Sequence, residues 1–234
     1  MSSTGFEHNI NTLTSTATVR KIRKRILLTG KIKYQKFPWR DTENKWHALI
    51  AEIMLQRTRT SSVLPVYLSF TEKFPEPQDL AEARLNEIED YIRPLGLLWR
   101  APLLQQLAKE ITCRNGEIPV QLQDLLSLPG VGSYVAAAWL SFHAGKRSVI
   151  VDANIVRWIC RMIDVETNGE TRRKKWLINI IEIITPQKNV KNFSYAMLDF
   201  TMSVCTKIPK CSTCIFKKDI CLYSCKNEVD NEII

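Results

Sequence analysis

Five of the seven cysteines are crowded into one short segment near the C-terminal end of the chain: Cys205, Cys211, Cys214, Cys221 and Cys225. Thiolates spaced in this way within one loop suit a 4Fe-4S cluster, whose ligands are cysteine sulfurs. Zinc is the first alternative, but zinc ribbons usually pair two C-x2-C knuckles, and only one is present. The segment therefore predicts a metal site with ligands Cys205, Cys211, Cys214 and Cys221, and Cys225 is a candidate to replace Cys221.

Two carboxylates form the second group of residues that could do chemistry. Glu52 interrupts the apolar run ALIAEIML, where burial of a carboxylate is costly without a purpose, although an edge position on the helix would also explain it. Asp152 lies between SVIV and ANIVRW, where its ordinary role is to cap the following helix. Taken alone, Asp152 is therefore a cap and Glu52 is ambiguous.

A third pattern is LPGVGSY, residues 128–134, which separates two helical segments. Glycines at 130 and 132 permit positive φ and a close approach of the backbone to another surface. Such a turn leaves the first amides of the next helix free to bind a phosphate, and Ser133 is placed to cap that helix or to donate its hydroxyl group. An ordinary tight connection between two helices is the alternative to this helix–hairpin–helix interpretation.

The overall composition favours a polyanionic partner and an intracellular protein. The 234 residues carry a net charge of +9, which is typical of nucleic-acid-binding proteins, and Lys207, Lys210, Lys217 and Lys218 surround the cysteine segment. No apolar run is long enough to span a membrane, and no signal peptide precedes the first helix, so we expect a cytoplasmic protein with reduced thiols. Cys113 and Cys160 lie in apolar helical contexts and are expected in the core.

The elements that must position these residues are almost all helical. Apolar residues recur at helical spacing through most of the chain, and only SVIV alternates like a strand. A basic helix is expected to end at Gly30, after a loose segment at residues 1–15. We expect an all-α protein.

These motifs in this order resemble those of the endonuclease III/MutY superfamily of helix–hairpin–helix (HhH-GPD) DNA glycosylases. The resemblance is carried by LPGVGSY, VDAN and YAMLDFTMSVC, and spans residues 37–221. FPWR followed by ALIAEIMLQRTRTSSV looks like the N-terminal motif of the monofunctional branch. The resemblance implies a monomer that binds double-stranded DNA and excises a flipped base. It also implies two helical lobes with a DNA-binding cleft between them: residues 43–145 would form one bundle, and residues 16–42 with 146–234 a discontinuous lobe around the cluster.

The resemblance also implies a role for each matching residue. Asp152 would stabilise the oxocarbenium-like transition state, and Glu52 would protonate the leaving base or order the attacking water. Gln56 and Arg57 would fill the gap that the flipped nucleotide leaves. The hairpin would bind the DNA backbone through its residues Leu128, Gly130, Val131, Gly132 and Ser133.

Tyr134 suggests which branch the chain belongs to. Bifunctional members have a nucleophilic lysine here and adenine glycosylases usually a serine, whereas the thymine/uracil mismatch glycosylases have tyrosine. The resemblance therefore implies excision of thymine or uracil opposite guanine, without cleavage of the strand. An adenine glycosylase is one alternative, although full-length members carry a further C-terminal domain, which we do not expect in this protein. A non-catalytic DNA-binding or redox module is another.

The cysteine spacing departs from the family pattern. The family usually has spacers of six, two and five residues, whereas this chain has five, two and six. The total is unchanged, so a cluster is still expected. The choice between Cys221 and Cys225 stays open.

Overall fold

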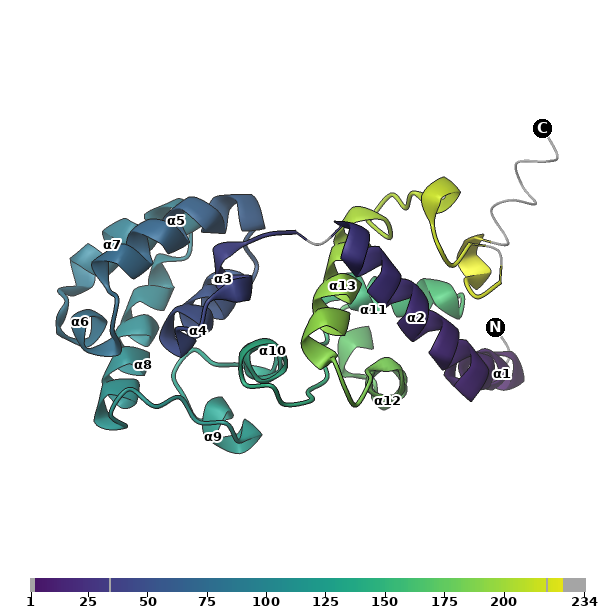
Figure 1. Cartoon of the computed structure of the whole chain (residues 1–234), viewed down its shortest axis with the longest axis horizontal. Coiled ribbons are helices and arrows are strands. Elements are labelled where there is room, and N and C mark those ends of the chain that lie inside the picture. The colour runs from purple at the N-terminus through teal and green to yellow at the C-terminus, as the bar shows by residue number, and fades with distance from the viewer. Residues whose placement is uncertain (1–2, 34, 218, 225–234) are drawn as a thin grey trace. The chain divides into compact units, whose positions relative to one another are not determined.

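The computed structural model describes residues 3–33, 35–217 and 219–224, which form helices joined by loops and contain no β-strand (Figure 1). The all-α prediction is confirmed. Residues 148–151, whose sequence alternates like a strand, form a loop, since a lone extended segment has no neighbouring strand among the described residues to pair with. No helix in the described part of the chain is long and apolar enough to cross a membrane.

The chain divides into two compact units, Lys36–Ser148 and the combination of Met1–Gln35 with Val149–Ile234. The continuous unit contains α3 (Pro38–Asp41), α4 (Lys45–Met54), α5 (Thr60–Lys73), α6 (Pro77–Glu82), α7 (Leu85–Ile92), η1 (Arg93–Leu95), η2 (Leu98–Arg100), α8 (Ala101–Cys113), α9 (Leu122–Leu126) and α10 (Ser133–His143). The discontinuous unit contains α1 (Ser3–Thr14), α2 (Thr16–Lys33), α11 (Ala153–Met162), η3 (Thr171–Arg173), α12 (Lys175–Ile184), α13 (Val190–Ser203) and η4 (Cys211–Thr213).

The core of the continuous unit is built around α4 and α10. Both helices are apolar on nearly all sides, as expected for helices that other helices surround. Asn44 caps α4 by accepting a hydrogen bond from the backbone N–H of His47 at 3.1 Å. Because α4 and α10 pack directly on each other, side chains that face inward from the two helices can meet.

In the discontinuous unit, α2 packs along α13 at very short range. A Cβ placed on Gly30 would lie 2.5 Å from the Cβ of Ala196, a distance that real side chains do not reach. The prediction that α2 ends at Gly30 was wrong, because the helix continues to Lys33. The glycine is needed for the close approach of the two helices and not for a helix end.

The expectation of a loose segment at residues 1–15 was also wrong, because residues 3–14 form α1. Leu13 of this helix is buried. The ring of Phe6 packs edge-on against Trp176 of α12, with ring centroids 5.3 Å apart, and the side chain of Asn9 donates to the carbonyl of Ile163 at 3.1 Å. These contacts hold residues 3–14 in place, although the segment is polar and has little apolar periodicity of its own.

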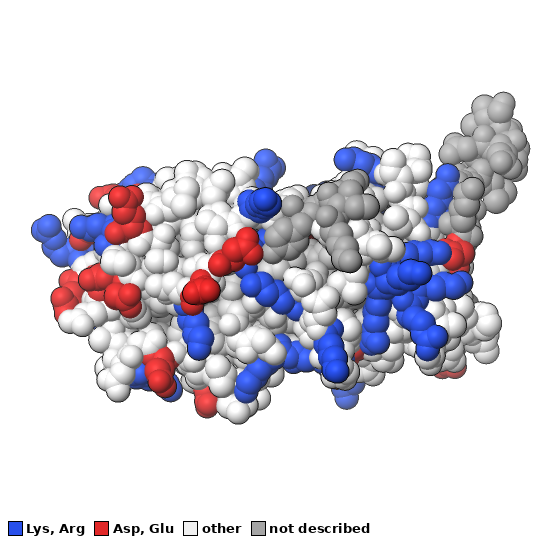
Figure 2. Space-filling view, viewed as in Figure 1, with Lys and Arg blue, Asp and Glu red and all other residues white. Residues whose placement is uncertain are grey.

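On the face shown in Figure 2, charged side chains are unevenly distributed within each unit. In the discontinuous unit, Lys and Arg side chains gather over α2, where Arg20, Lys21 and Lys24 are exposed. In the continuous unit, acidic side chains gather near α6 and α7. The net positive charge is therefore not spread evenly over the protein.

The Gly30–Ala196 crossing gives a test of the discontinuous unit. Gly30→Ala should lower the free energy of unfolding by about 1–2 kcal/mol, because overpacking outweighs the gain in helix propensity. In an Ala196→Gly background the same change should instead stabilise by up to about 1 kcal/mol, since only the propensity gain remains. Chemical denaturation of the four variants measures both values. Equal effects in the two backgrounds would show that the helices do not approach closely at this point.

Candidate functional site

Glu52 is buried in the continuous unit and contacts a histidine. Its residue exposure is 1%, and its Oε1 lies 3.4 Å from Nε2 of His143, the last residue of α10. Both side chains are almost completely withdrawn from solvent. The edge position considered for Glu52 is excluded. A buried carboxylate needs a polar partner, and His143 supplies one.

The turn that follows α4 carries Gln56 and Arg57, and an arginine fixes its shape. The buried guanidinium of Arg100 donates to the carbonyl of Ile53 at 2.9 Å and to that of Gln56 at 2.8 Å. Burial lowers the pKa of Arg100, and the charge of Arg57 lowers it further. Arg57 itself is exposed and has φ of 60°, a conformation that non-glycine residues adopt at some cost.

The residues of the hairpin between α9 and α10 differ in burial and in backbone conformation. The side chains of Leu128 and Val131 are buried, so contact with DNA at these positions would be restricted to the backbone. Gly130 has φ of 75°, whereas Gly132 has φ of −88° and is not in the left-handed region. A Cβ on Gly132 would meet no atom within 4 Å, so the backbone there is open to an approaching group.

The helix α10 begins one residue earlier than it would if Ser133 were its cap. Gly132 is the N-cap residue and Ser133 the first helical residue, so the proposed capping role of Ser133 was wrong. The first intrahelical hydrogen bond runs from the N–H of Ala136 to the carbonyl of Gly132. The amides of Gly132 and Ser133 therefore precede the helical ladder, at its positive end. Tyr134 follows directly, half-buried against the core of this unit.

Asp152 belongs to the discontinuous unit, where it is the N-cap of α11. Its Oδ1 accepts from the backbone N–H of Ile155, and its Oδ2 from the side-chain amide of Asn154, both at 2.7 Å. Arg157 then donates to Oδ1 of Asn154 at 2.9 Å and to the carbonyl of Cys205 at 3.0 Å. A continuous series of hydrogen bonds therefore joins Asp152 to the start of the cysteine loop.

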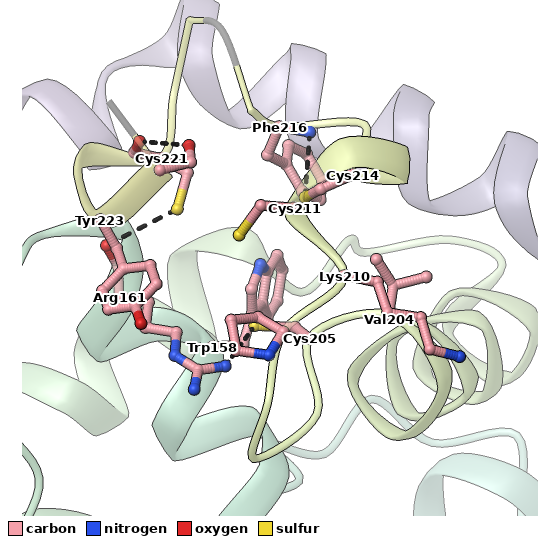
Figure 3. Close-up of a pocket in the computed structure, with 12 residues that line it drawn as sticks. Trp158, Arg161, Val204, Cys205, Lys210, Cys211, Cys214, Phe216, Cys221 and Tyr223 are labelled. Carbon is pink, nitrogen blue, oxygen red and sulfur yellow. Dashed lines mark hydrogen bonds between the residues drawn. The ribbon is translucent and has the colours of Figure 1, made fainter. Parts of the chain in front are cut away.

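The four cysteines expected as ligands line one pocket (Figure 3). The loop that carries them is anchored by Phe216, which is fully buried and packs its ring against Trp158 of α11 and Phe200 of α13. The backbone N–H of Phe216 donates to Sγ of Cys214 at 3.5 Å. Arg161 donates to Sγ of Cys205 at 3.4 Å and stacks over the ring of Tyr223.

The chemistry of this donor set fits a thiolate-bound metal group. Burial raises the pKa of the Cys214 thiol to about 11 and also raises that of Cys221, so both thiols are neutral at pH 7 until a cation displaces the proton. N–H donors directed at sulfur stabilise the thiolate form. Within the described residues, no group of three or more His, Cys, Asp or Glu side chains is already arranged to hold a metal ion.

Other predictions around the loop have mixed outcomes. Cys160 is buried as expected, and burial raises its pKa to about 11, but Cys113 is exposed at the C-terminal end of α8. Lys207 and Lys210 are exposed beside the cysteines. Cys225 and Lys218 lie outside the described residues, so the choice between Cys221 and Cys225 stays a prediction.

The structure thus groups the predicted site residues by unit. Glu52, the Gln56–Arg57 turn and the hairpin with Tyr134 belong to the continuous unit, and Asp152 and the cysteines to the discontinuous one. Sequence reasoning missed His143 and Arg100, whose partners are far away along the chain. It also missed Asn154 and Arg157, although an Asn two residues and an Arg five residues after a capping Asp is a pattern that could have been noticed.

Comparisons with known proteins agree with these motifs. Residues 50–178 match the family model described as "HhH-GPD superfamily base excision DNA repair protein". A thymine/uracil-DNA glycosylase of Pyrobaculum aerophilum is 36% identical, over 82% of this chain and 86% of its own. A thymine-DNA glycosylase of Aeropyrum pernix is 34% identical, over 88% and 95% respectively.

An adenine DNA glycosylase of Buchnera aphidicola subsp. Baizongia pistaciae is 33% identical over 84% of this chain, which spans only 55% of that relative. Among solved structures, a thermostable thymine-DNA glycosylase superposes with a TM-score of 0.80 and 32% identity, over 88% of this chain and 98% of its own. A trapped endonuclease III–DNA covalent intermediate, at 24% identity and a TM-score of 0.76, has the same fold.

Proposed function

The chain belongs to the HhH-GPD superfamily of base excision DNA repair proteins, and we propose that it is a monofunctional DNA glycosylase that removes thymine or uracil opposite guanine. The observation that carries this proposal is Tyr134, at the start of α10 directly after the hairpin. The high-coverage relatives named as thymine or thymine/uracil glycosylases support the same assignment.

In the proposed reaction, the bond between the base and C1′ of the sugar breaks, the oxygen of a water molecule bonds to C1′, and a proton is transferred to the departing base. The carboxylate of Asp152, fixed by Ile155 and Asn154, would stabilise the positive charge that develops on the sugar. Glu52 would donate the proton or order the water, with its carboxyl group held by His143. The predicted cleft, in which both carboxylates would face the flipped nucleotide, stays a prediction.

DNA would be bound by the hairpin backbone and by the turn after α4. The amides at the start of α10 would hold a phosphate, and the open backbone at Gly132 leaves room for it. Arg57 would contact the orphaned guanine, whose acceptors suit a guanidinium. We expect the protein to act as a monomer, and its intracellular location stays a prediction.

We also propose that Cys205, Cys211, Cys214 and Cys221 hold a 4Fe-4S cluster. The support is the pocket that all four line and the N–H donors aimed at two of the sulfurs. Bound there, the cluster would supply a rigid cross-link for the loop, and an electron-transfer centre if it is redox-active. The chain's own residues then position the loop: Phe216 anchors it in the core, and Arg157 and Arg161 bind its backbone.

An adenine glycosylase is the second candidate, favoured by the match to the Buchnera protein. A non-catalytic DNA-binding module is less well supported, because binding alone requires neither a buried Glu52 nor a capped Asp152.

A panel of mismatched duplexes tests the first proposal. The purified protein should excise thymine from G·T and uracil from G·U pairs. Asp152→Asn should reduce excision about 100-fold or more while DNA binding persists, because asparagine retains the cap of α11 but not the charge. Release of adenine from A·G or A·8-oxoguanine with G·T and G·U left intact would instead favour the second candidate. Retained turnover in Asp152→Asn would remove the assigned role of this carboxylate.

The absence of strand cleavage has its own test at Tyr134. Borohydride treatment with an abasic duplex should trap no covalent adduct, because a phenol cannot form a Schiff base with the sugar. Tyr134→Lys places an amine at this position and serves as the positive control. An adduct with the unaltered protein would contradict monofunctional chemistry.

Metal analysis tests the cluster. We expect about four iron and four sulfide ions per chain, as the 4Fe-4S stoichiometry requires. Cys221→Ser should lose iron, whereas Cys225→Ser should retain it, and the reverse result would exchange the two assignments. Zinc in place of iron, or no metal in freshly purified protein, would overturn the cluster proposal.

A further inference from the structure

His143 and Glu52 form a pair of ionisable side chains that is closed off from solvent within the continuous unit. The two side chains are 4% and 2% exposed, and Nε2 of His143 lies 3.4 Å from Oε1 of Glu52. Burial of an ionised side chain is costly unless a partner of opposite charge compensates it. The pair therefore has its lowest cost when it carries one proton and no net charge, either as an ion pair or as two neutral groups.

The position of the pair at two helix ends favours the same state. His143 is the last residue of α10, where the negative end of the helix dipole stabilises an imidazolium. Glu52 lies in the last turn of α4, where the dipole opposes an anionic carboxylate, although Arg100 at this end offsets part of that effect. Both helices thus favour retention of a proton on the pair.

Neighbouring ionisable groups do not compensate either member of the pair. On α4 itself, Lys45 is exposed, and His47 lies 3.0 Å from the carbonyl of Pro75. The elements packed against α4 and α10 are α3, α5 and α9. Among the described residues, none of their ionisable side chains forms a hydrogen bond or an ion pair with Glu52 or His143. These side chains are Arg40, Asp41, Tyr67, Glu72, Lys73 and Asp124.

We propose that His143 is a positioning residue through which the buried pair supplies the proton that the departing base takes up. This inference rests on the proposed function, since it takes the excision of thymine or uracil as the reaction. It also decides between the two roles considered for Glu52. With His143 beside it, Glu52 is the proton donor and not the residue that orders the water.

The proton balance of the reaction closes within this pair. One proton is shared between Glu52 and His143 at the start. As the bond between C1′ and the base breaks, its electron pair leaves with the base, and Glu52 transfers the proton to that base. A carboxylate then remains beside a neutral imidazole. The water molecule that bonds to C1′ gives up one proton, which restores the pair, so the overall reaction is a hydrolysis.

Two leaving groups of different quality test the proposal. Single-turnover excision is measured for thymine and for 5-fluorouracil, each opposite guanine, because fluorine stabilises the departing base and makes it less dependent on a proton. His143→Gln retains a polar group that cannot hold a transferable proton. It should slow the excision of thymine about 10-fold to 100-fold and that of 5-fluorouracil less than about 5-fold, as expected for a partial loss of general acid catalysis.

Binding and a matched variant are the controls. The affinity of His143→Gln for a duplex with a tetrahydrofuran abasic analogue opposite guanine should change less than about 2-fold, because the proton acts on the chemical step. Ser141→Ala alters another buried polar side chain of α10, whose hydroxyl donates to the carbonyl of Ser148 at 3.2 Å. This variant should leave the ratio of the two excision rates unchanged.

A second measurement uses the coupling between the two residues. In a Glu52→Gln background, His143→Gln should slow thymine excision by less than about 2-fold more, since the proton donor is already lost. His143→Asn provides an independent variant, and thermal denaturation shows whether each protein is folded. The ratio of two rates measured on one sample does not depend on the folded fraction, so a variant of low stability still gives a result.

Three results would overturn the role of His143: an unchanged rate of thymine excision in both variants, equal losses for thymine and 5-fluorouracil, or fully additive effects with Glu52→Gln. Equal losses are what a purely structural role would produce. Failure of the proposed function looks different, because the unaltered protein would then excise neither base. Failure of the His143 proposal leaves the excision by the unaltered protein intact.

Discussion

Helices leave carbonyl groups unpaired at their C-terminal ends, and in this protein arginine side chains satisfy many of them. Arg100 binds one carbonyl in the last turn of α4 and one just after it. Arg23 binds carbonyls at the end of α12, and Arg157 and Arg161 bind those that follow α13. Each guanidinium bridges two or more oxygens, which its planar group of donors allows. The segments that leave these helix ends, including the turn with Gln56 and the loop with the cysteines, owe their paths to these bridges.

This use of arginine changes how the net charge of the protein is interpreted. A total of +9 suggested a nucleic-acid partner, but several of the 33 basic residues serve the interior of the fold. Arg25 is also bound within the protein, although at its surface, since Nη1 and Nη2 of its guanidinium both donate to the carboxylate of Asp219 in the cysteine loop. The basic surface available to a phosphate backbone is thus smaller than the composition indicates, and individual exposed residues such as Arg57 matter more than the sum.

The sequence predicted well those features that residues close together in the chain determine. The hairpin, the cap at Asp152 and the helix around Glu52 follow from short motifs and helical periodicity. What it did not predict depends on residues that are far apart in the chain: His143 beside Glu52, Arg157 at the carbonyl of Cys205, and Gly30 against Ala196. The folded residues 3–14 belong to the same class, because their order comes from contacts with α12 and with Ile163, not from their own composition.

The crossing of α2 and α13 also bears on the order in which the protein folds during synthesis. Residues 36–148 form a unit made of consecutive segments, so its helices can pack as soon as they have emerged from the ribosome. The partner of Gly30 is Ala196, so α2 must wait for almost the whole chain before its apolar face is covered. During that interval the basic helix α2 would expose Ile22 and Ile26, which are buried in the folded protein. Chaperones or early aggregation would act on this segment first.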